Sequence, residues 1–270
     1  MPSISIEIPT NFDKRIVESL ESIRTQTFQD LETIVVATDR NVKELVEGFD
    51  VKLLIAPFSG TLIRRIIAHN IAKGDKALLF EASRQLDKDA LNILNRDNHH
   101  MLIIEEKDIG NSQIARIQNI ERHINLININ QPSPASLIVE PRLYDSRLLN
   151  QVYEKVRNID KNVLSHIQFG DLDIIYYEGY SISDDLGVIK QPLIYHHTDQ
   201  TLLQLAIKYY NYGRSNKVLK LTPYGSVFRS SKHLRPYYGL KNSSLVYSLL
   251  LVKAISFFSG MYLSKGLPNE

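Results

Sequence analysis

Cysteine is absent from the 270 residues of this chain. The absence excludes disulfide bonds, thiolate metal sites and thiol nucleophiles, and it fits a reducing compartment. A strong charge excess is missing too, because 32 basic residues and 30 acidic ones leave a net charge of +2. This balance gives no indication of nucleic acid as a partner. The hydrophobic fraction of 43% is ordinary for a globular protein, and the chain is long enough to bury a substantial core.

A secretory signal is missing from the opening stretch "MPSISIEIPT", which has neither a long apolar run nor a basic segment before one. We therefore expect the protein to reside in the cytoplasm. Internal repeats, low-complexity segments and a convincing interdomain linker are missing as well. The simplest organisation is one α/β domain over residues 1–220, followed by a basic and apolar extension over residues 221–270.

The first half of the chain alternates between strand and helix patterns. Ile4, Ile6 and Ile8 recur with period two, whereas Ile16, Leu20 and Ile23 fall on one helical stripe. The same alternation continues to residue 82. It predicts strands at 3–8, 31–37, 51–57 and 77–82, and helices at 14–26, 41–49 and 61–74.

Strands that alternate with helices through short connections form a mostly parallel sheet with helices on both faces. In such sheets ligands bind beyond the carboxyl ends of the strands. These ends lie at residues 9–10, 37–40, 57–58 and 81–84, where we expect a site.

The second half is less regular. Its patterns predict helices at 87–95, 145–158 and 200–213, the last ending at Gly213. They predict strands at 100–106, 115–120, 136–141 and 188–197.

Five segments, taken in order, resemble the family-2 glycosyltransferases, which have the GT-A fold. They are "IEIPTNFDKRIVESLESIRTQTFQDLETIVV", "RRIIAHNIAKGDKALLFEAS", "LIVEPRLYDSRLL", "FGDLDI" and "IYHHTDQTLLQLAIKYYNYGRS". The resemblance covers residues 3 to 215. It implies a Rossmann-like nucleotide-sugar-binding fold that transfers a sugar from a nucleotide-diphosphate sugar to a hydroxyl acceptor. The acceptor would be a polysaccharide or a lipid-linked sugar.

The family's paired aspartates, which bind a divalent cation, are replaced here by Glu81, Ala82 and Ser83. Magnesium and manganese favour hard oxygen ligands, and such a cation would neutralise the leaving diphosphate. Glu81 offers one carboxylate and Ser83 only a hydroxyl, so we expect weak metal binding. Arg84 adds a positive charge, which would hold phosphate in place of part of the cation.

The resemblance also assigns the donor-binding residues. Pro9 and Thr10 would hold the base through their backbone turn. Asp39 is the carboxylate nearest to the family's position after the second strand, and the alternative is an ordinary loop residue. Arg65 aligns with an arginine that would hold diphosphate oxygens, with Arg64 as a substitute, and the alternative is a solvated helix face.

Asp171 occupies the position of the family's general base, with Asp173 as a second candidate. The alternative is that Asp171 caps a short helix or turn. His196 and His197 end a strand and face opposite sides, so at most one is expected in the site. They and the aromatic-basic pair Tyr212 and Arg214 would border the acceptor or the phosphates, or serve only in packing.

The stretch 243–263 is almost continuously apolar and approaches the roughly 20 residues that span a bilayer. Lys253 interrupts it at a cost of roughly 2.5–3.5 kcal/mol for insertion. Basic residues precede it, namely Arg229, Lys232, Arg235 and Lys241. This pattern favours a helix packed on the domain, or one lying peripherally on the inner face of a membrane.

Two further functions compete with the transferase. A degenerate transferase-like module would bind nucleotide, glycan or a protein partner without turnover, and the replacements at Ala37 and Ser83 favour it. A nucleotidyltransferase has less support, because no glycine-rich, lysine-containing phosphate loop follows the first strand.

Overall fold

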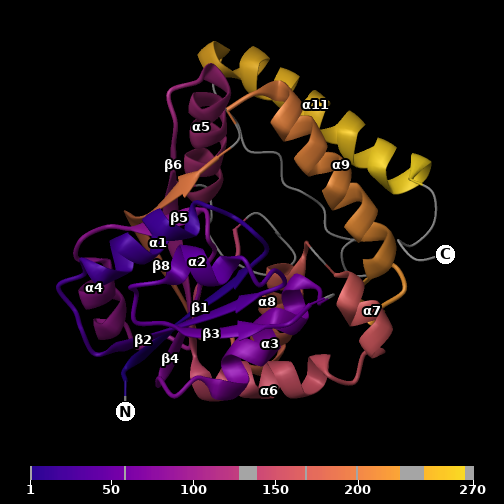
Figure 1. Ribbon diagram of the computed structural model, residues 1–270. Helices are drawn as coiled ribbons and strands as arrows, with labels where there is room; N and C mark the ends of the chain where they lie inside the picture. The colour runs from indigo at the N-terminus through magenta and orange to yellow at the C-terminus, as the bar shows by residue number, and fades with distance from the viewer. Residues whose placement is uncertain are drawn as a thin grey trace.

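The computed structural model describes residues 2–57, 59–127, 139–167, 169–198, 200–225 and 240–264. Figure 1 shows a mixed α/β domain with a helix pair, α9 and α11, along one side. Strands and helices alternate through the first third of the chain, as the sequence predicts.

An eight-stranded sheet organises the molecule, in the order β3-β2-β1-β4-β7-β6-β8-β5. Its first half is parallel and holds the four strands predicted at the start of the chain. They are β1 (Ile4–Thr10), β2 (Leu31–Ala37), β3 (Lys52–Ile55) and β4 (Lys76–Leu79).

The second half of the sheet is mixed. β7 (Leu143–Asp145) runs antiparallel to β4 and to β6 (Met101–Ile109), while β8 (Leu186–His197) runs parallel to β6. The short edge strand β5 (Arg84–Leu86) pairs antiparallel with β8. The β6–β8 register shifts around Glu105, where the strand irregularity re-aims the side chains that follow.

Helices cover both faces, as predicted. One face holds α1 (Ile16–Arg24), α2 (Val42–Val46) and α4 (Ala90–Arg96), and the other holds α3 (Thr61–Ile71), α6 (Ser146–Val156), α7 (Lys161–His166) and α8 (Asp171–Ile182). The remaining helices are α5 (Gln113–Ile127), α9 (Leu202–Leu219), η1 (Pro223–Gly225) and α11 (Leu240–Leu263).

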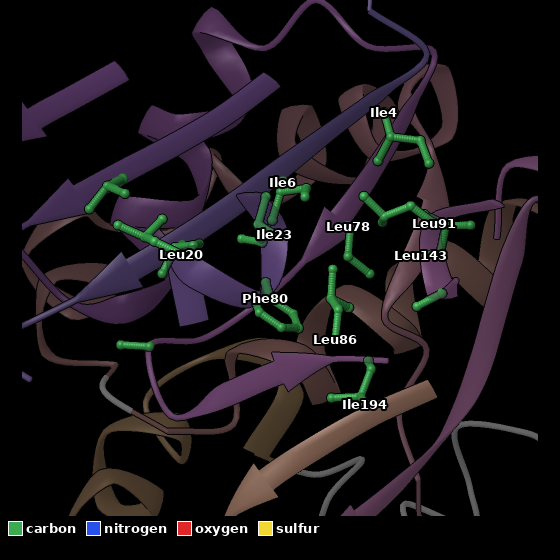
Figure 2. Packing of buried hydrophobic residues seen from close by; sticks show 14 of the residues in the cluster. Ile4, Ile6, Leu20, Ile23, Leu78, Phe80, Leu86, Leu91, Leu143 and Ile194 are labelled. Carbon is green, nitrogen blue, oxygen red and sulfur yellow. The ribbon is translucent and has the colours of Figure 1, made fainter. Parts of the chain in front are cut away.

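The alternating isoleucines of β1 face a cluster formed with α1, in which Ile16, Leu20 and Ile23 are buried, as predicted (Figure 2). Burial of these side chains contributes roughly 1.5–3 kcal/mol each. Between them, Ser5 and Glu7 are buried on the opposite face of the same strand. The strand is thus covered on both sides, as central parallel strands are.

Three predicted elements are wrong or lie partly outside the described residues. Residues 115–120 are helical within α5, because Ile114, Ile117 and Ile120 recur at helical rather than strand spacing. The predicted strand at 136–141 lies half outside the described residues, and Val139 to Pro141 are not in a strand. Helix α9 does not end at Gly213 but continues to Leu219.

The helix continues through Gly213, and α11 packs closely against it at this position. A Cβ atom at Gly213 would overlap the carbonyl oxygen of Phe257, and one at Gly260 would overlap that of Tyr210. The two glycines let the backbones of α9 and α11 approach closely. Lys217 at the end of α9 donates to the carbonyl oxygen of Ser264 (2.7 Å), which extends the contact.

Within the described residues, Ser244–Leu263 is long and apolar enough to cross a membrane by length and composition, and 28% of it is buried. Length and composition alone are weak evidence for a span.

Candidate active site

A cavity of about 870 Å³ opens at the carboxyl ends of β1 and β4, where the sheet topology places ligands. Its wall is completed by the ends of β6 and β8, the start of α8 and one face of α9. Most of the residues predicted for the site line it: Pro9, Thr10, Arg65, Glu81, Ser83, Arg84, Asp171, Asp173, His196, His197 and Tyr212.

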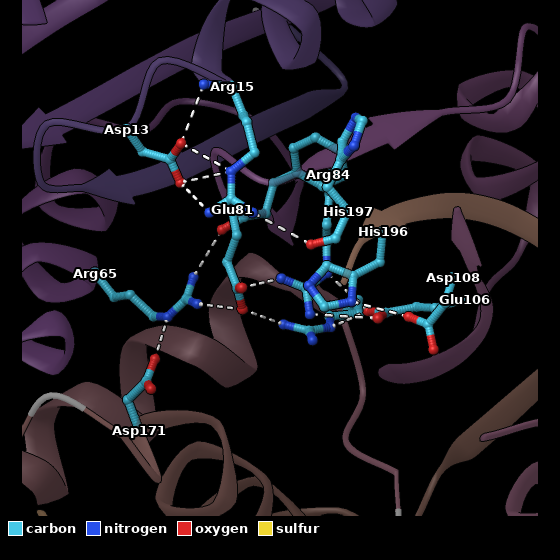
Figure 3. A network of polar contacts seen from close by, with 12 residues as sticks. Asp13, Arg15, Arg65, Glu81, Arg84, Glu106, Asp108, Asp171, His196 and His197 are labelled. Atoms are coloured by element: carbon cyan, nitrogen blue, oxygen red, sulfur yellow. Dashed lines mark hydrogen bonds and ion pairs between the residues drawn. The ribbon is translucent and has the colours of Figure 1, made fainter. Parts of the chain in front are cut away.

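Glu81, at the expected metal position, is held by three guanidinium groups (Figure 3). Arg142 Nη1 lies 3.0 Å from its Oε1 and Arg65 Nη2 lies 3.7 Å away, while Arg84 pairs with its Oε2. Burial alone would raise the pKa of Glu81, but these cations outweigh burial and lower it to about 2. The Glu81 carboxylate is therefore charged and already compensated by protein.

Glu106 is the second centre of this network. Its carboxylate accepts from Arg142 Nε (2.8 Å), Arg84 Nε (3.1 Å) and Arg122 Nη1 (2.6 Å). The sequence reasoning missed Glu106, Arg122 and Arg142. The available signal was the pair of carboxylates at Glu106 and Asp108, which recur with period two at the end of a strand.

His196 lies inside this network, whereas His197 faces the other side of β8, as the alternation predicts. His196 Nδ1 lies 3.0 Å from Asp108 and 3.3 Å from Arg122 Nη2. Burial, helped by the charge of Arg84, lowers the pKa of His196 to about 3, so its ring is neutral at pH 7.

His197 has separate partners. Its Nε2 atom lies 2.8 Å from Glu18 and 2.8 Å from Gln85, and its carbonyl oxygen accepts from Arg15. Although the two histidines face opposite sides of β8, both reach the cavity wall.

Asp171 begins α8, directly after Gly170, whose φ of 84° is in the left-handed region that favours glycine. Its Oδ2 accepts from Arg65 Nε at 2.5 Å, and both side chains are buried. Arg65 is thus not on a solvated helix face. Asp173, one helical half-turn on, has a pKa raised well above its usual range by burial and by a hydrogen bond with Glu140.

Arg64, the neighbour of Arg65, points toward the end of β1. Its Nη1 donates to Asn11 Oδ1 (2.5 Å) and its Nη2 to Thr61 Oγ1 (3.1 Å). Asn11 Oδ1 also accepts from Thr38 Oγ1 (3.1 Å). The turn after β1 is thereby tied to α3 and to the end of β2.

Two of the predicted site residues do not line the cavity. Asp39 accepts from the backbone N–H of Asn41 (2.8 Å), which makes it a turn residue before α2. Arg214 lies on α9 outside the cavity lining, whereas Tyr212 packs on Phe169 within it, with ring centroids 4.4 Å apart.

A divalent cation does not fit the residues at the expected metal position. The carboxylate of Glu81 is already paired with arginines, and Ser83 beside them offers only a neutral hydroxyl as a ligand. Among the described residues, no group of three or more His, Asp or Glu side chains is arranged to hold a metal ion. The guanidinium groups would also repel a cation placed beside Glu81.

No protein-family model matches the sequence. No curated protein matches it either. Solved structures of TarS from S. aureus, a glycosyltransferase, do match the fold. The structure of TarS residues 1–349 in complex with UDP has a TM-score of 0.54 and 14% sequence identity, covering 97% of this chain and 82% of that one.

A second TarS structure gives a TM-score of 0.53 and 13% identity, and this chain spans 55% of its length. At this identity the likeness shows the fold alone. The fold is a mixed α/β, GT-A-like Rossmann architecture with a C-terminal helix added.

Proposed function

We propose that this protein is a glycosyltransferase that moves a sugar from a nucleotide-diphosphate sugar to a hydroxyl acceptor. One observation carries the proposal. The carboxylate of Asp171 lies in the same cavity as the turn after β1, within a fold shared with a TarS structure that contains UDP. A candidate general base and a candidate nucleotide-binding turn therefore line the same cavity.

The donor's base lies against Pro9 and Thr10, whose backbone turn offers hydrogen-bonding groups to a pyrimidine edge. Uracil is the base we favour, because TarS, with the same fold, is seen with UDP. Asp39 lies outside the cavity lining, so it does not contact the donor in this proposal.

The reaction is an inverting displacement. The acceptor hydroxyl oxygen attacks the anomeric carbon of the sugar, the bond from that carbon to the diphosphate oxygen breaks, and the nucleoside diphosphate leaves. The hydroxyl proton passes to Asp171. Asp173 suits this role less well, because its raised pKa favours a carboxyl group that already carries a proton.

The acceptor lies toward α9. Phe169 and Tyr212 present an aromatic wall to the cavity, with Lys208 Nζ 6.0 Å from the Tyr212 ring centre. Aromatic faces beside polar groups suit the apolar and hydroxyl-bearing sides of a sugar. The acceptor class is a glycan or a lipid-linked sugar.

A screen of nucleotides tests the donor class. Purified protein is titrated calorimetrically with UDP, GDP and their sugar conjugates, and thermal unfolding is followed in parallel. We expect binding by uridine nucleotides and a higher unfolding temperature at saturation. Binding of none of these compounds would contradict the proposal.

The second candidate is a non-catalytic module that binds nucleotide or glycan. The arginines paired with Glu81 favour this module, because the family's usual metal ligands are replaced at this position. Nucleotide binding without any turnover of the bound sugar conjugate would support this module over the transferase.

A further inference from the structure

Arg64 is buried and forms no ion pair with any acidic side chain that the structure describes. It is only 2% exposed, and its Nε atom has no hydrogen-bond partner among the residues the structure describes. Its other contacts, to Asn11 and Thr61, are with neutral oxygen atoms. A buried cation normally has an anionic partner, because desolvation of an unpaired charge is costly.

The other arginines of the cavity do have such partners. Arg15 pairs with Asp13, Arg65 with Asp171, Arg84 with Glu81, and Arg122 and Arg142 with Glu106. Arg64 forms no ion pair within the described ranges. Burial and the nearby charge of Arg65 lower the pKa of Arg64 to about 10, against the opposing charge of Asp171.

We propose that Arg64 is the anion-binding residue of the cavity and that it holds a phosphoryl group of the nucleoside diphosphate without a divalent cation. The inference rests on the proposed function. The free Nε–H donates to a phosphoryl oxygen, and Asn11 acts as a positioning residue that fixes the guanidinium plane. Arg84 and Arg142 stay paired with Glu81, which occupies the position where the family places its cation.

The test is a titration of wild type and Arg64→Gln with UDP and with uridine, in chelator and again with manganese. We expect wild type to bind UDP equally well in both buffers. Arg64→Gln should weaken UDP binding by about 10- to 100-fold, as loss of a charge-assisted hydrogen bond does, and leave uridine binding unchanged. Arg40→Gln, an exposed arginine after β2, is the matched control.

Thermal unfolding adds a second readout. An arginine that serves only stability would lower the unfolding temperature when replaced, whereas an unpaired buried cation should leave it equal or raise it. UDP binding by wild type that needs manganese, or an unchanged UDP affinity in Arg64→Gln, would overturn the inference while the proposed function stands. Absence of nucleotide binding by wild type would overturn both.

A different observation concerns the outer face of α11. Five side chains at helical spacing are exposed there by 46–67%: Tyr247, Leu251, Ile255, Phe258 and Tyr262. In Figure 1 this helix lies outermost, along α9. Lys253, the single charged residue from 244 to 263, is 8% exposed and pairs with Glu121 of α5.

The lysine that interrupts this segment in the sequence is thus turned toward the protein, and the exposed face is free of charge. Basic residues flank it. Lys220 lies 5.4 Å from the ring centre of Tyr262. In sequence, residues 226–243 contain four basic residues and no acidic one. Arg229, Lys232 and Arg235 lie outside the described residues, as does the side chain of Lys241.

The geometry points to an anionic membrane surface as the occupant of this face, with α11 lying in the plane of the interface. Only one side of the helix is free, because α9 and α5 cover the other, so the helix docks on the bilayer instead of crossing it. An apolar stripe with aromatic residues and Lys220 beside it suits acidic headgroups, and the basic composition of residues 226–243 agrees with this partner.

Co-sedimentation with vesicles tests this second proposal. The 270-residue protein should bind phosphatidylcholine–phosphatidylglycerol vesicles about tenfold or more tightly than phosphatidylcholine vesicles. Ile255→Glu should abolish binding, while Val17→Glu, at an exposed position of α1, should not. Equal binding by Ile255→Glu would overturn the proposal. The proposal would also be overturned if wild type formed a dimer and did not bind vesicles, and if Ile255→Glu dissociated that dimer. The face would then be covered by a second copy of the chain.

Discussion

Arg65 Nε lies 2.5 Å from Asp171 Oδ2, joining α3 to α8 across 106 residues of sequence. Arg65 is 1% exposed, and its guanidinium also approaches Glu81 and the carbonyl oxygen of Phe80. This pair fixes the carboxylate that we assign as the base. Through Arg65 it also connects the Asp171 carboxylate to Glu81 and the arginines around Glu81.

Replacing Arg65 should therefore be costly. We predict that Arg65→Met lowers the free energy of unfolding by about 3–5 kcal/mol, because Asp171 is left buried without its partner. Urea denaturation measures the change. Arg24→Met is the control, since its pair with Glu21 is largely exposed and should contribute at most about 1 kcal/mol. Equal losses in the two variants would contradict the assignment.

Acid should destabilise the protein through His196. Its pKa is about 3 when folded and near 6.5 when unfolded, so the unfolded chain binds the extra proton between these values. Stability then falls as pH drops, by about 2–3 kcal/mol between pH 6.5 and 4.5. Glu81 contributes a further loss only below about pH 4.5.

The variant His196→Gln should remove most of that slope, measured by urea unfolding at pH 6.5 and at pH 4.5. His123→Gln, at an exposed histidine of α5, is the control and should keep the slope. If the stability of His196→Gln still fell between pH 6.5 and pH 4.5 as it does in wild type, other groups would be the cause.

Asp173 should make the folded protein less stable as the pH rises, which is the opposite of the effect of His196. Its raised pKa means that the folded state keeps a proton that the unfolded state releases above its ordinary pKa of 3.8. Stability is therefore lost as pH rises from that value through the raised one. Asp173→Asn should become progressively more stable than wild type from pH 4 to pH 8. A stability difference that does not change over this range would contradict the raised pKa of Asp173.

The contact between α9 and α11 depends on two glycines. We predict that Gly260→Ala costs about 1–3 kcal/mol, because its methyl group would overlap the backbone of Tyr210. Hydrogen exchange of α11 should become faster as the helix detaches. Ser259→Ala, the preceding residue on the same helix, should leave exchange unchanged, and equal acceleration in both variants would refute the explanation.

The parallel half of the sheet was predictable because local patterns decide it. Ile4, Ile6 and Ile8 alternate, and the following stripe of Ile16, Leu20 and Ile23 packs on them. The turn after β4 and the position of Asp171 followed from motif resemblance. The spacing of Ile114, Ile117 and Ile120 is that of a helix, so the strand predicted at 115–120 is wrong although the helical pattern is present in the sequence.

The arginine network could not be predicted in the same way. Glu106, Arg122 and Arg142 come from β6, α5 and the approach to β7, and only the register of the mixed half of the sheet brings them to Glu81. Arg64 and Arg65 are adjacent in sequence, but helix rotation gives Arg65 an acidic partner, whereas Arg64 meets only neutral oxygen atoms in the part of the chain that the structure describes. Which arginine pairs with which carboxylate therefore depends on the tertiary structure.

Release of UDP from UDP-sugar conjugates, compared between wild type and Asp171→Asn, tests the central claim most directly. The account predicts measurable release by wild type in the presence of hydroxyl acceptors. Asp171→Asn should be slower by about 10²- to 10⁴-fold, as loss of a general base implies, with UDP affinity retained. Equal rates in the two proteins, or UDP binding with no release by wild type, would contradict a transferase based on Asp171.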